Sequence, residues 1–328
     1  MDASRRMFVG MGVAAAAVAG SALKASAATD PMKSPFNKFW IAAVTPVDRN
    51  GNFDNSANDA MLAWWKAQGA DGVLLLGTTG EAQSFSIAER KKILEQASKN
   101  KHGLDFIVGT GASNYPDAIE LSRHAADNGA DSVLITPPFY DKNPNSKGVL
   151  AYFDKVFAQV KTPVRYYHIP RTTGVPIEDT SAFFTALAQH PNLVGVKDSN
   201  GDAKEFDLIT AAMPNLNVVT GTDNLMENTL SRGHGCILAS GNIFTKQNAA
   251  IYAAHRTNGD WKGALARAGD AQKAFRATVG VGGEEVNKYA LSLLLNRPQI
   301  YSRAPTVPLD EALKPKIAQA VSQLKTLG

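Results

Sequence analysis

Residues 69–81 have the sequence Gly-Ala-Asp-Gly-Val-Leu-Leu-Leu-Gly-Thr-Thr-Gly-Glu, and this stretch contains the unit from which the fold is built. Its first glycines predict a turn, the apolar run 72–76 predicts a strand, and the Gly-Thr-Thr-Gly loop predicts a connection to a helix. Residues 87–98 follow, with Ile87, Ile93 and Leu94 on one stripe and charged side chains opposite, which predicts an amphipathic helix. The turn returns as Gly-Ala-Asp-Ser at 129–132. The repeat indicates a recurring strand–helix unit.

The same pattern of a short apolar run followed by a polar turn occurs eight times. The runs are 40–44, 72–76, 106–109, 132–135, 164–167, 194–197, 218–220 and 236–239. They are continuously apolar, as expected of parallel strands that are buried on both faces. Eight such strands with crossover helices predict an α/β fold, a (β/α)₈ TIM barrel. A doubly wound sheet is the alternative, but Thr45-Pro46-Val47 follows the first run where a nucleotide-binding fold would have a glycine-rich turn.

The two ends of the chain differ from this repeat. After the eighth run the sequence is helical, with segments expected at 260–278, 284–295 and 309–327. We therefore expect a barrel over residues 28–258 and a C-terminal helical region over 259–328.

The first 27 residues have the pattern of a signal peptide. Arg5 and Arg6 precede Phe8 and a small-residue apolar run, and Ala25-Ser26-Ala27 forms an A-x-A cleavage pattern. The arginine pair resembles a twin-arginine export signal. A short membrane anchor is the alternative, although the run falls short of the about 20 apolar residues that a spanning helix needs. We expect export to the periplasm, with no membrane attachment after processing.

Composition excludes several classes of function. The chain of 328 residues is 44% hydrophobic and 20% charged, and its 34 basic against 30 acidic residues give a net charge of +4. This profile is that of a globular protein without the basic patch of a nucleic-acid-binding protein. The single cysteine, Cys236, excludes an intrachain disulfide and a cysteine-based zinc cluster. The six histidines show no metal-ligand spacing.

Two polar residues at strand ends are difficult to explain by packing. Lys197 lies in the otherwise apolar run Val194-Gly195-Val196-Lys197. Burial of a lysine favours its neutral amine, a nucleophile toward carbonyl carbon. The alternative is a lysine that reaches solvent or pairs with Asp198. Tyr167 ends the neighbouring run, where it acts as an acid/base group or simply as a core aromatic.

The loop Gly77-Thr78-Thr79-Gly80-Glu81 joins a strand to a helix. Backbone N–H groups and hydroxyls in such a loop bind carboxylates or phosphates. Helix capping by Thr79 or Ser84 is the simpler alternative.

Taken together, five motifs resemble the dihydrodipicolinate synthase / N-acetylneuraminate lyase family of class I pyruvate aldolases. They are Gly77-Thr-Thr-Gly-Glu81, Gly109-Thr-Gly111, Tyr167-His-Ile-Pro170, Gly195-Val-Lys-Asp-Ser199 and Gly221-Thr-Asp223. The resemblance implies a TIM barrel, a homotetramer built from tight dimers, and no metal or organic cofactor. It also implies a small-molecule 2-oxo acid as substrate.

The resemblance further implies a role for each matching residue. Lys197 would form the Schiff base and Tyr167 would be the general acid/base, while Thr78 and Tyr140 would extend the proton relay, Tyr140 across the tight dimer. Phe139 directly precedes Tyr140 and is the alternative match to the same position. The predicted substrate-binding residues are Thr79, Gly80, Ser199, Asp223 and Ser240.

Departures from the family pattern bear on the substrate. Lysine-pathway synthases place an arginine where this chain has Thr172, Arg171 lies one position earlier, and His168 replaces the usual asparagine. The region 189–202 is similar to 4-hydroxy-2-oxoglutarate aldolases, and the Gly221-Thr-Asp223 motif resembles sugar-acid aldolases. We therefore expect a lyase that cleaves a 2-keto-3-deoxy sugar acid or a 4-hydroxy-2-oxoglutarate-type substrate to pyruvate or glyoxylate plus an aldehyde or 2-oxo acid, with dehydration as a further possibility. The alternatives are a 4-hydroxy-tetrahydrodipicolinate synthase and an exported 2-oxo-acid-binding protein without turnover.

Overall fold

The strands of the protein close into a barrel. The computed structural model describes residues 31–280 and 282–326, so the predicted signal peptide lies outside the described residues. Eight parallel strands pair in chain order, and the last pairs with the first, which confirms the barrel and excludes the doubly wound sheet. The strands are β1 (Phe39–Ala42), β2 (Gly72–Leu75), β3 (Asp105–Gly109), β4 (Ser132–Ile135), β5 (Val164–His168), β6 (Leu193–Asp198), β7 (Asn217–Thr220) and β8 (Cys236–Leu238).

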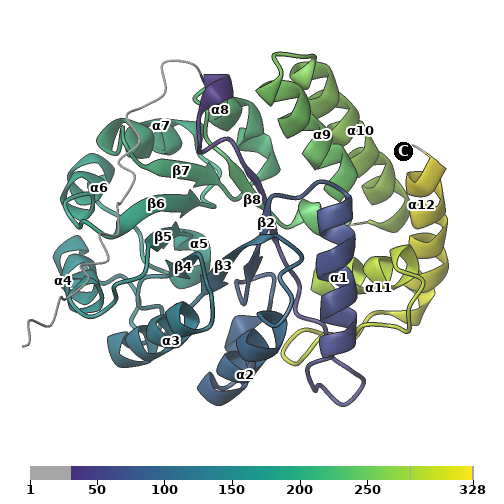
Figure 1. Cartoon of the computed structure of the whole chain (residues 1–328), viewed down its shortest axis with the longest axis horizontal. Coiled ribbons are helices and arrows are strands. Elements are labelled where there is room, and N and C mark those ends of the chain that lie inside the picture. Colours follow the sequence, from purple (N-terminus) through teal and green to yellow (C-terminus); the bar gives the residue numbers. More distant parts are fainter. Residues whose placement is uncertain (1–30, 281, 327–328) are drawn as a thin grey trace, which may run out of the picture.

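Helices surround the strands, as Figure 1 shows. They are α1 (Asn55–Ala67), α2 (Ile87–Ala97), α3 (Tyr115–Asp127), α4 (Ser146–Phe157), α5 (Pro170–Thr173), α6 (Thr180–Leu187), α7 (Ala203–Ala212), α8 (Met226–Leu230) and α9 (Thr245–Arg256). Side-chain caps fix where several of the long helices begin, among them α1, α2, α3 and α4. At α2, for example, Ser86 accepts from the Glu89 amide and the Glu89 side chain accepts from the Ser86 amide. Such a capping box satisfies two backbone donors that the helix leaves unpaired.

The alternation of side chains along each strand separates two cores. One cluster fills the barrel interior, with Leu74, Leu134, Tyr167 and Val219 among its members. A larger cluster packs between the strands and the helices and includes Tyr166 and Val196. Successive strand residues point to opposite faces, so Tyr167 and Lys197 face the interior while their neighbours face the helices.

The C-terminal region forms a third cluster beside the barrel. It consists of α10 (Trp261–Val279), α11 (Glu284–Leu294) and α12 (Lys314–Thr326), which gather on one side of the molecule in Figure 1. Phe275, Val286 and Ile317 pack there with Phe244, which precedes α9. In the part of the chain that the structure describes, no helix is both long and apolar enough to cross a bilayer.

Candidate active site

Lys197 and Tyr167 lie side by side at the carboxyl ends of neighbouring strands. The two residues are direct partners in the β5–β6 register, and Lys197 Nζ lies 4.5 Å from the centroid of the Tyr167 ring. Lys197 is only 3% exposed, so its amine does not reach bulk solvent. Asp198 faces the opposite side of the strand and forms no ion pair with Lys197. The position therefore excludes both structural alternatives for this lysine.

The Tyr167 hydroxyl is the centre of a small polar network. Ser199 Oγ donates to it at 3.5 Å, and the Thr78 side chain is a further hydrogen-bond partner. Burial alone raises the pKa of the Tyr167 phenol. The positive charge of Lys197, together with the bonds from Ser199 and Thr78, outweighs burial, so this pKa lies below its ordinary value. A phenol with a lowered pKa beside an amine is suited to exchange protons with a bound molecule.

Gly221 is a site residue whose role the sequence did not predict, although it lies in a quoted motif. A Cβ built on Gly221 would overlap Ser199 Oγ and would come within 2.8 Å of Lys197 Cε. The Lys197 and Ser199 side chains therefore occupy the space that a side chain at position 221 would need. Only glycine permits this close approach of β7 to the site.

A cavity of about 500 Å³ opens above strands β2 to β5. Thr78, Thr136, Tyr167 and Thr172 are among the side chains that line it. This volume lies within the range of about 300–1,000 Å³ for small-molecule pockets. Tyr167 forms part of the wall, so a small molecule in the cavity can reach this residue. Lys197 is not among the lining residues and lies next to the cavity through its contact with the Tyr167 ring.

Some residues of the predicted Gly77–Glu81 loop line the cavity, and others are buried in the protein. Thr78 lines the cavity, whereas Thr79 is buried. The Gly80 carbonyl accepts from Thr45 Oγ1 at 2.7 Å. Thr79 and Gly80 thus lie in the loop beside the cavity and are not among its lining residues.

The end of this loop is fixed by the C-terminal region. Glu81 has a φ of 52°, in the left-handed region that a non-glycine residue seldom adopts. Its carboxylate forms a buried ion pair with Lys288 of α11 and accepts the backbone N–H of Arg303 at 3.2 Å. Residues more than 200 positions away in the chain therefore hold the loop, which the sequence did not predict.

Asp223 and Ser240 lie together but outside the cavity wall. Ser240 Oγ donates to Asp223 Oδ1 at 2.6 Å, and Gln272 of α10 donates to the same oxygen at 3.0 Å. Neither Asp223 nor Ser240 belongs to the described residues that line the cavity. In a single chain, these two predicted substrate ligands are occupied with each other and with α10.

The predicted relay tyrosine also lies outside the cavity of its own chain. Tyr140 is 81% exposed, and the adjacent Phe139 is the residue that lines the cavity. A contribution of Tyr140 to a neighbouring subunit stays a prediction. At the position of the family's arginine, Thr172 lines the cavity while Arg171 is exposed.

Behind the lysine–tyrosine pair, on the outer face of the same strands, lies a buried polar cluster. His168 pairs with Asp198 in the β5–β6 register, and His168 Nε2 lies 3.1 Å from Glu205 Oε1 of α7. Burial raises the pKa of Asp198 to about 6, although a backbone bond from Asn200 opposes it. The hydrogen bond to His168 lowers the pKa of Glu205 despite partial burial. This cluster joins the strands to α7 and does not face the cavity.

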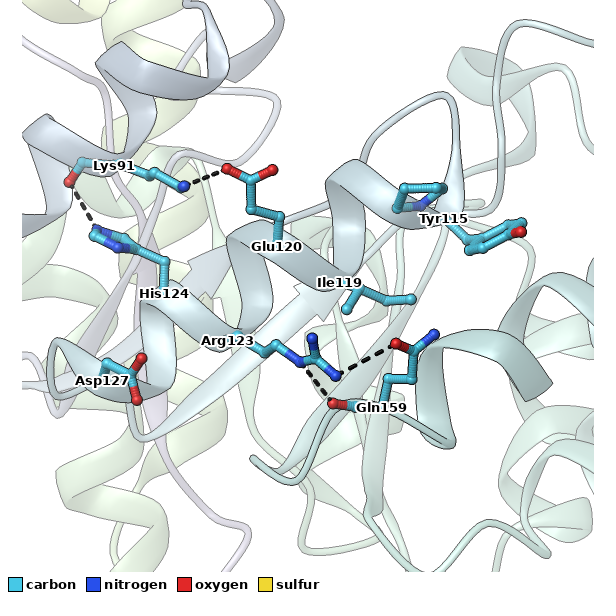
Figure 2. A pocket seen from close by; sticks show the side chains of 9 residues that line it. Lys91, Tyr115, Ile119, Glu120, Arg123, His124, Asp127 and Gln159 are labelled. Carbon is cyan, nitrogen blue, oxygen red and sulfur yellow. Dashed lines mark hydrogen bonds and ion pairs between the residues drawn. The ribbon is translucent and has the colours of Figure 1, made fainter.

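A second hollow, of about 590 Å³, lies on the outer surface between α2, α3 and the end of α4 (Figure 2). Its polar side chains bind one another. Lys91 pairs with Glu120, and Arg123 Nε donates to the Gln159 carbonyl at 3.0 Å. No strand end contributes to its wall, so it lacks the position that catalytic groups occupy in a barrel.

Within residues 31–280 and 282–326, no group of three or more histidine, cysteine, aspartate or glutamate side chains is placed to hold a metal ion.

Known proteins are similar to this chain in sequence and in fold. The model of the Dihydrodipicolinate synthetase family matches residues 35–324. An uncharacterized DapA-like lyase of Chloroflexus aurantiacus is 37% identical over 246 residues, 74% of this chain and 81% of that protein. A 4-hydroxy-tetrahydrodipicolinate synthase of Acidiphilium cryptum is 32% identical over 296 residues, 89% of this chain and 100% of that protein.

Two solved structures with pyruvate are also similar. The prophage protein YagE from E. coli K12, in complex with pyruvate, superposes with a TM-score of 0.79 at 27% identity, covering 90% of this chain and 99% of that one. The chloride-inhibited dihydrodipicolinate synthase from Acinetobacter baumannii, complexed with pyruvate, gives 0.78 at 26% identity, covering 88% and 99%.

Proposed function

The chain belongs to the dihydrodipicolinate synthetase family, and we propose that Lys197 is the amine that forms a Schiff base with its 2-oxo acid substrate. The family consists of carbon–carbon lyases and synthases of the class I aldolase type, so the protein is an enzyme of this type. One observation carries the proposal. The buried Lys197 Nζ lies 4.5 Å from the ring centroid of Tyr167, at the end of neighbouring strands.

The proposed cleavage proceeds through an imine. Lys197 attacks the C2 carbonyl of the substrate, the carbonyl oxygen leaves as water, and a protonated imine forms. The C3–C4 bond then breaks, its electron pair moves toward the imine to give an enamine, and the C4 hydroxyl loses its proton as the aldehyde forms. Protonation of the enamine at C3 and hydrolysis of the imine release pyruvate and restore the amine.

Tyr167 is the residue we propose for these proton transfers. Its hydroxyl is held by Ser199 and Thr78, and its lowered pKa eases the exchange of a proton. Thr79, Gly80 and the loop amides are proposed to hold the 2-oxo-acid carboxylate, as the resemblance implies. Tyr140 of a second subunit is proposed to complete the relay.

For the substrate, we propose a 2-keto-3-deoxy sugar acid or a 4-hydroxy-2-oxoglutarate-type acid. Thr172 supports this choice, because it lines the cavity where a lysine-pathway synthase would present an arginine to its aldehyde substrate. Arg171, one position earlier on α5, is exposed and is not among the residues that line the cavity.

The second candidate is 4-hydroxy-tetrahydrodipicolinate synthase. It is favoured by the Acidiphilium cryptum relative, which bears that name and matches over its whole length. Pyruvate and aspartate semialdehyde as substrates separate the two functions. Efficient condensation of this pair would favour the synthase and contradict our choice.

The experiment that tests the proposed function is a substrate panel assayed for pyruvate release. The purified protein would be incubated with 2-keto-3-deoxy sugar acids, 4-hydroxy-2-oxoglutarate and N-acetylneuraminate. We expect cleavage of at least one acid by the wild type and none by Lys197→Ala. Binding of pyruvate without cleavage of any acid would instead indicate the exported binding protein.

We also propose that the protein is exported by a twin-arginine-type signal peptide and acts in the periplasm as a homotetramer. The residues that support export are Arg5, Arg6 and the pattern 25–27. Sequencing of the N-terminus of the periplasmic protein should find a start near Ala28, and an intact Met1 there would contradict cleavage. Light scattering of the purified protein tests the tetramer.

A further inference from the structure

The C-terminal region supplies part of the wall of the catalytic cavity. Glu284, the first residue of α11, lines the cavity together with Pro305 and Thr306. No site residue in this region was predicted from the sequence. Its position at the wall raises the question of which part of a substrate it meets.

Three charged side chains line the cavity, and two of them are already bound to protein groups. Arg90 is buried, and its NH2 group donates to the Gly109 carbonyl at 2.9 Å and to the Gly111 carbonyl at 3.2 Å. Glu81 is held by Lys288 and by the N–H of Arg303.

Glu284 is different because its carboxylate accepts a hydrogen bond from the backbone amide of the same residue. Three described residues of the cavity wall are charged. Of these, Glu284 is the one whose side chain forms no hydrogen bond or ion pair with another residue. Burial and the nearby Glu81 raise its pKa. Its carboxyl oxygens are therefore available to a ligand in the cavity.

The rest of this wall is neutral and rich in hydroxyl groups. Thr78, Ser84, Thr136, Thr172 and Thr306 all line the cavity, and the buried Thr136 Oγ1 has no hydrogen-bond partner. Such a wall offers donors and acceptors to hydroxyl groups. The cation among the described residues of this wall, Arg90, is already bound to the Gly109 and Gly111 carbonyls and is not available to a second carboxylate.

We propose that Glu284 is a specificity-determining residue whose carboxyl binds hydroxyl groups on the part of the substrate remote from the 2-oxo acid. This inference rests on the proposed function and selects between its two substrate classes. A hydroxyl bound to a carboxylate forms a charge-assisted hydrogen bond. A second substrate carboxylate at the same place lies beside the like charges of Glu284 and Glu81, and the nearby cation Lys288 is already paired with Glu81. The site thus selects a 2-keto-3-deoxy sugar acid with a neutral polyhydroxy chain over a dicarboxylic acid such as 4-hydroxy-2-oxoglutarate.

The test compares Glu284→Gln with the wild type on one acid of each class. Loss of a hydrogen bond to a charged group is expected to lower kcat/KM for the sugar acid about tenfold. Removal of the repulsion should raise kcat/KM for 4-hydroxy-2-oxoglutarate. The two values therefore change in opposite directions, and the ratio of kcat/KM for the sugar acid to that for 4-hydroxy-2-oxoglutarate falls. A ratio within about twofold of the wild type would overturn the inference.

Glu285→Gln is the matched control. Glu285 carries the same charge one residue further on, but it accepts from the Gly283 amide at 3.0 Å and does not belong to the cavity wall. We expect this variant to keep the wild-type ratio. An equal change in Glu285→Gln would assign the effect to the net charge of the region and contradict a specific role for Glu284.

Reduction with borohydride in the presence of pyruvate separates this inference from the proposed function. Pyruvate lacks the remote chain, so Glu284→Gln should form the Lys197 adduct as the wild type does. Absence of an adduct in the wild type would refute the Schiff-base function itself. A normal adduct with an unchanged substrate ratio would refute only the role of Glu284.

Discussion

The inner and outer faces of strands β5 and β6 carry different chemistry within one residue of each other. Tyr167 and Lys197 point into the barrel, while His168 and Asp198, the next residue on each strand, point toward α7. Of the inner pair, Tyr167 lines a cavity that a ligand can enter, and Lys197 contacts the Tyr167 ring. The outer pair is closed off beneath the helices.

The same burial has opposite consequences on the two faces. On the inner face, the charge of Lys197 overcomes burial and lowers the pKa of Tyr167. On the outer face, burial dominates and raises the pKa of Asp198 to about 6. On β5 and β6, the face to which a side chain points therefore decides whether it is available for chemistry. We interpret the inner groups as reactive and the outer groups as structural, and the following variants test that division from the largest effect to the smallest.

Removal of the inner amine should have the largest effect. For Lys197→Ala we expect loss of kcat in the range of about 10⁴- to 10⁶-fold, the scale on which removal of a nucleophile acts. Steady-state release of pyruvate is the measurement. As the control, Lys204→Ala removes an exposed lysine of α7, and this variant should keep full activity. Retention of activity by Lys197→Ala would contradict the distinction between the inner and outer faces of β5 and β6.

Neighbouring tyrosines on opposite faces provide the sharpest matched pair. Tyr167→Phe should lower kcat by about 10²–10⁴-fold, the usual contribution of a general acid/base. Tyr166→Phe removes a buried hydroxyl that has no hydrogen-bond partner and should leave kcat within about twofold. Comparable losses in both variants would show that the hydroxyls act through packing and not through proton transfer.

An added methyl group at Gly221 should disturb the inner face without removing any reactive group. Because the new Cβ would overlap Ser199 Oγ and approach Lys197 Cε, Gly221→Ala should displace both side chains. We expect a loss of kcat of about 10- to 100-fold, since small displacements of reacting groups are costly, and a loss of stability of about 1–3 kcal/mol from overpacking. Kinetics and thermal unfolding check the two parts, and an unchanged kcat would contradict the geometry.

Much of this arrangement followed from the sequence, for identifiable reasons. Continuous apolar runs predicted the eight strands to within two residues at each end, and parallel pairing of neighbouring strands placed Tyr167 beside Lys197. The role of Gly221 depends on the side chains of another strand. The contributions of Glu284 and Lys288 depend on how the C-terminal region folds back, which local patterns do not encode. The helix pattern of α2 likewise gave no sign that Arg90 is buried.

The smallest expected effect concerns the outer face and is seen in stability. Because folding raises the pKa of Asp198 from 3.8 to about 6, the stability that its protonated form contributes is complete below pH 3.8 and is lost as the pH rises through about 6. Asp198→Asn avoids this loss. The stability of this variant relative to wild type should therefore rise over that interval by at most about 3 kcal/mol, at about 1.4 kcal/mol per pKa unit, and its Tm should rise with it. A Tm difference that does not vary with pH would contradict a protonated Asp198.

Mass spectrometry of the protein after borohydride treatment with pyruvate tests the central claim, that the buried amine of β6 is the reactive one. The account predicts a single pyruvate-derived adduct, located in the peptide that contains Lys197 and missing from Lys197→Ala. An unmodified wild-type protein, or an adduct on a different lysine, would contradict it.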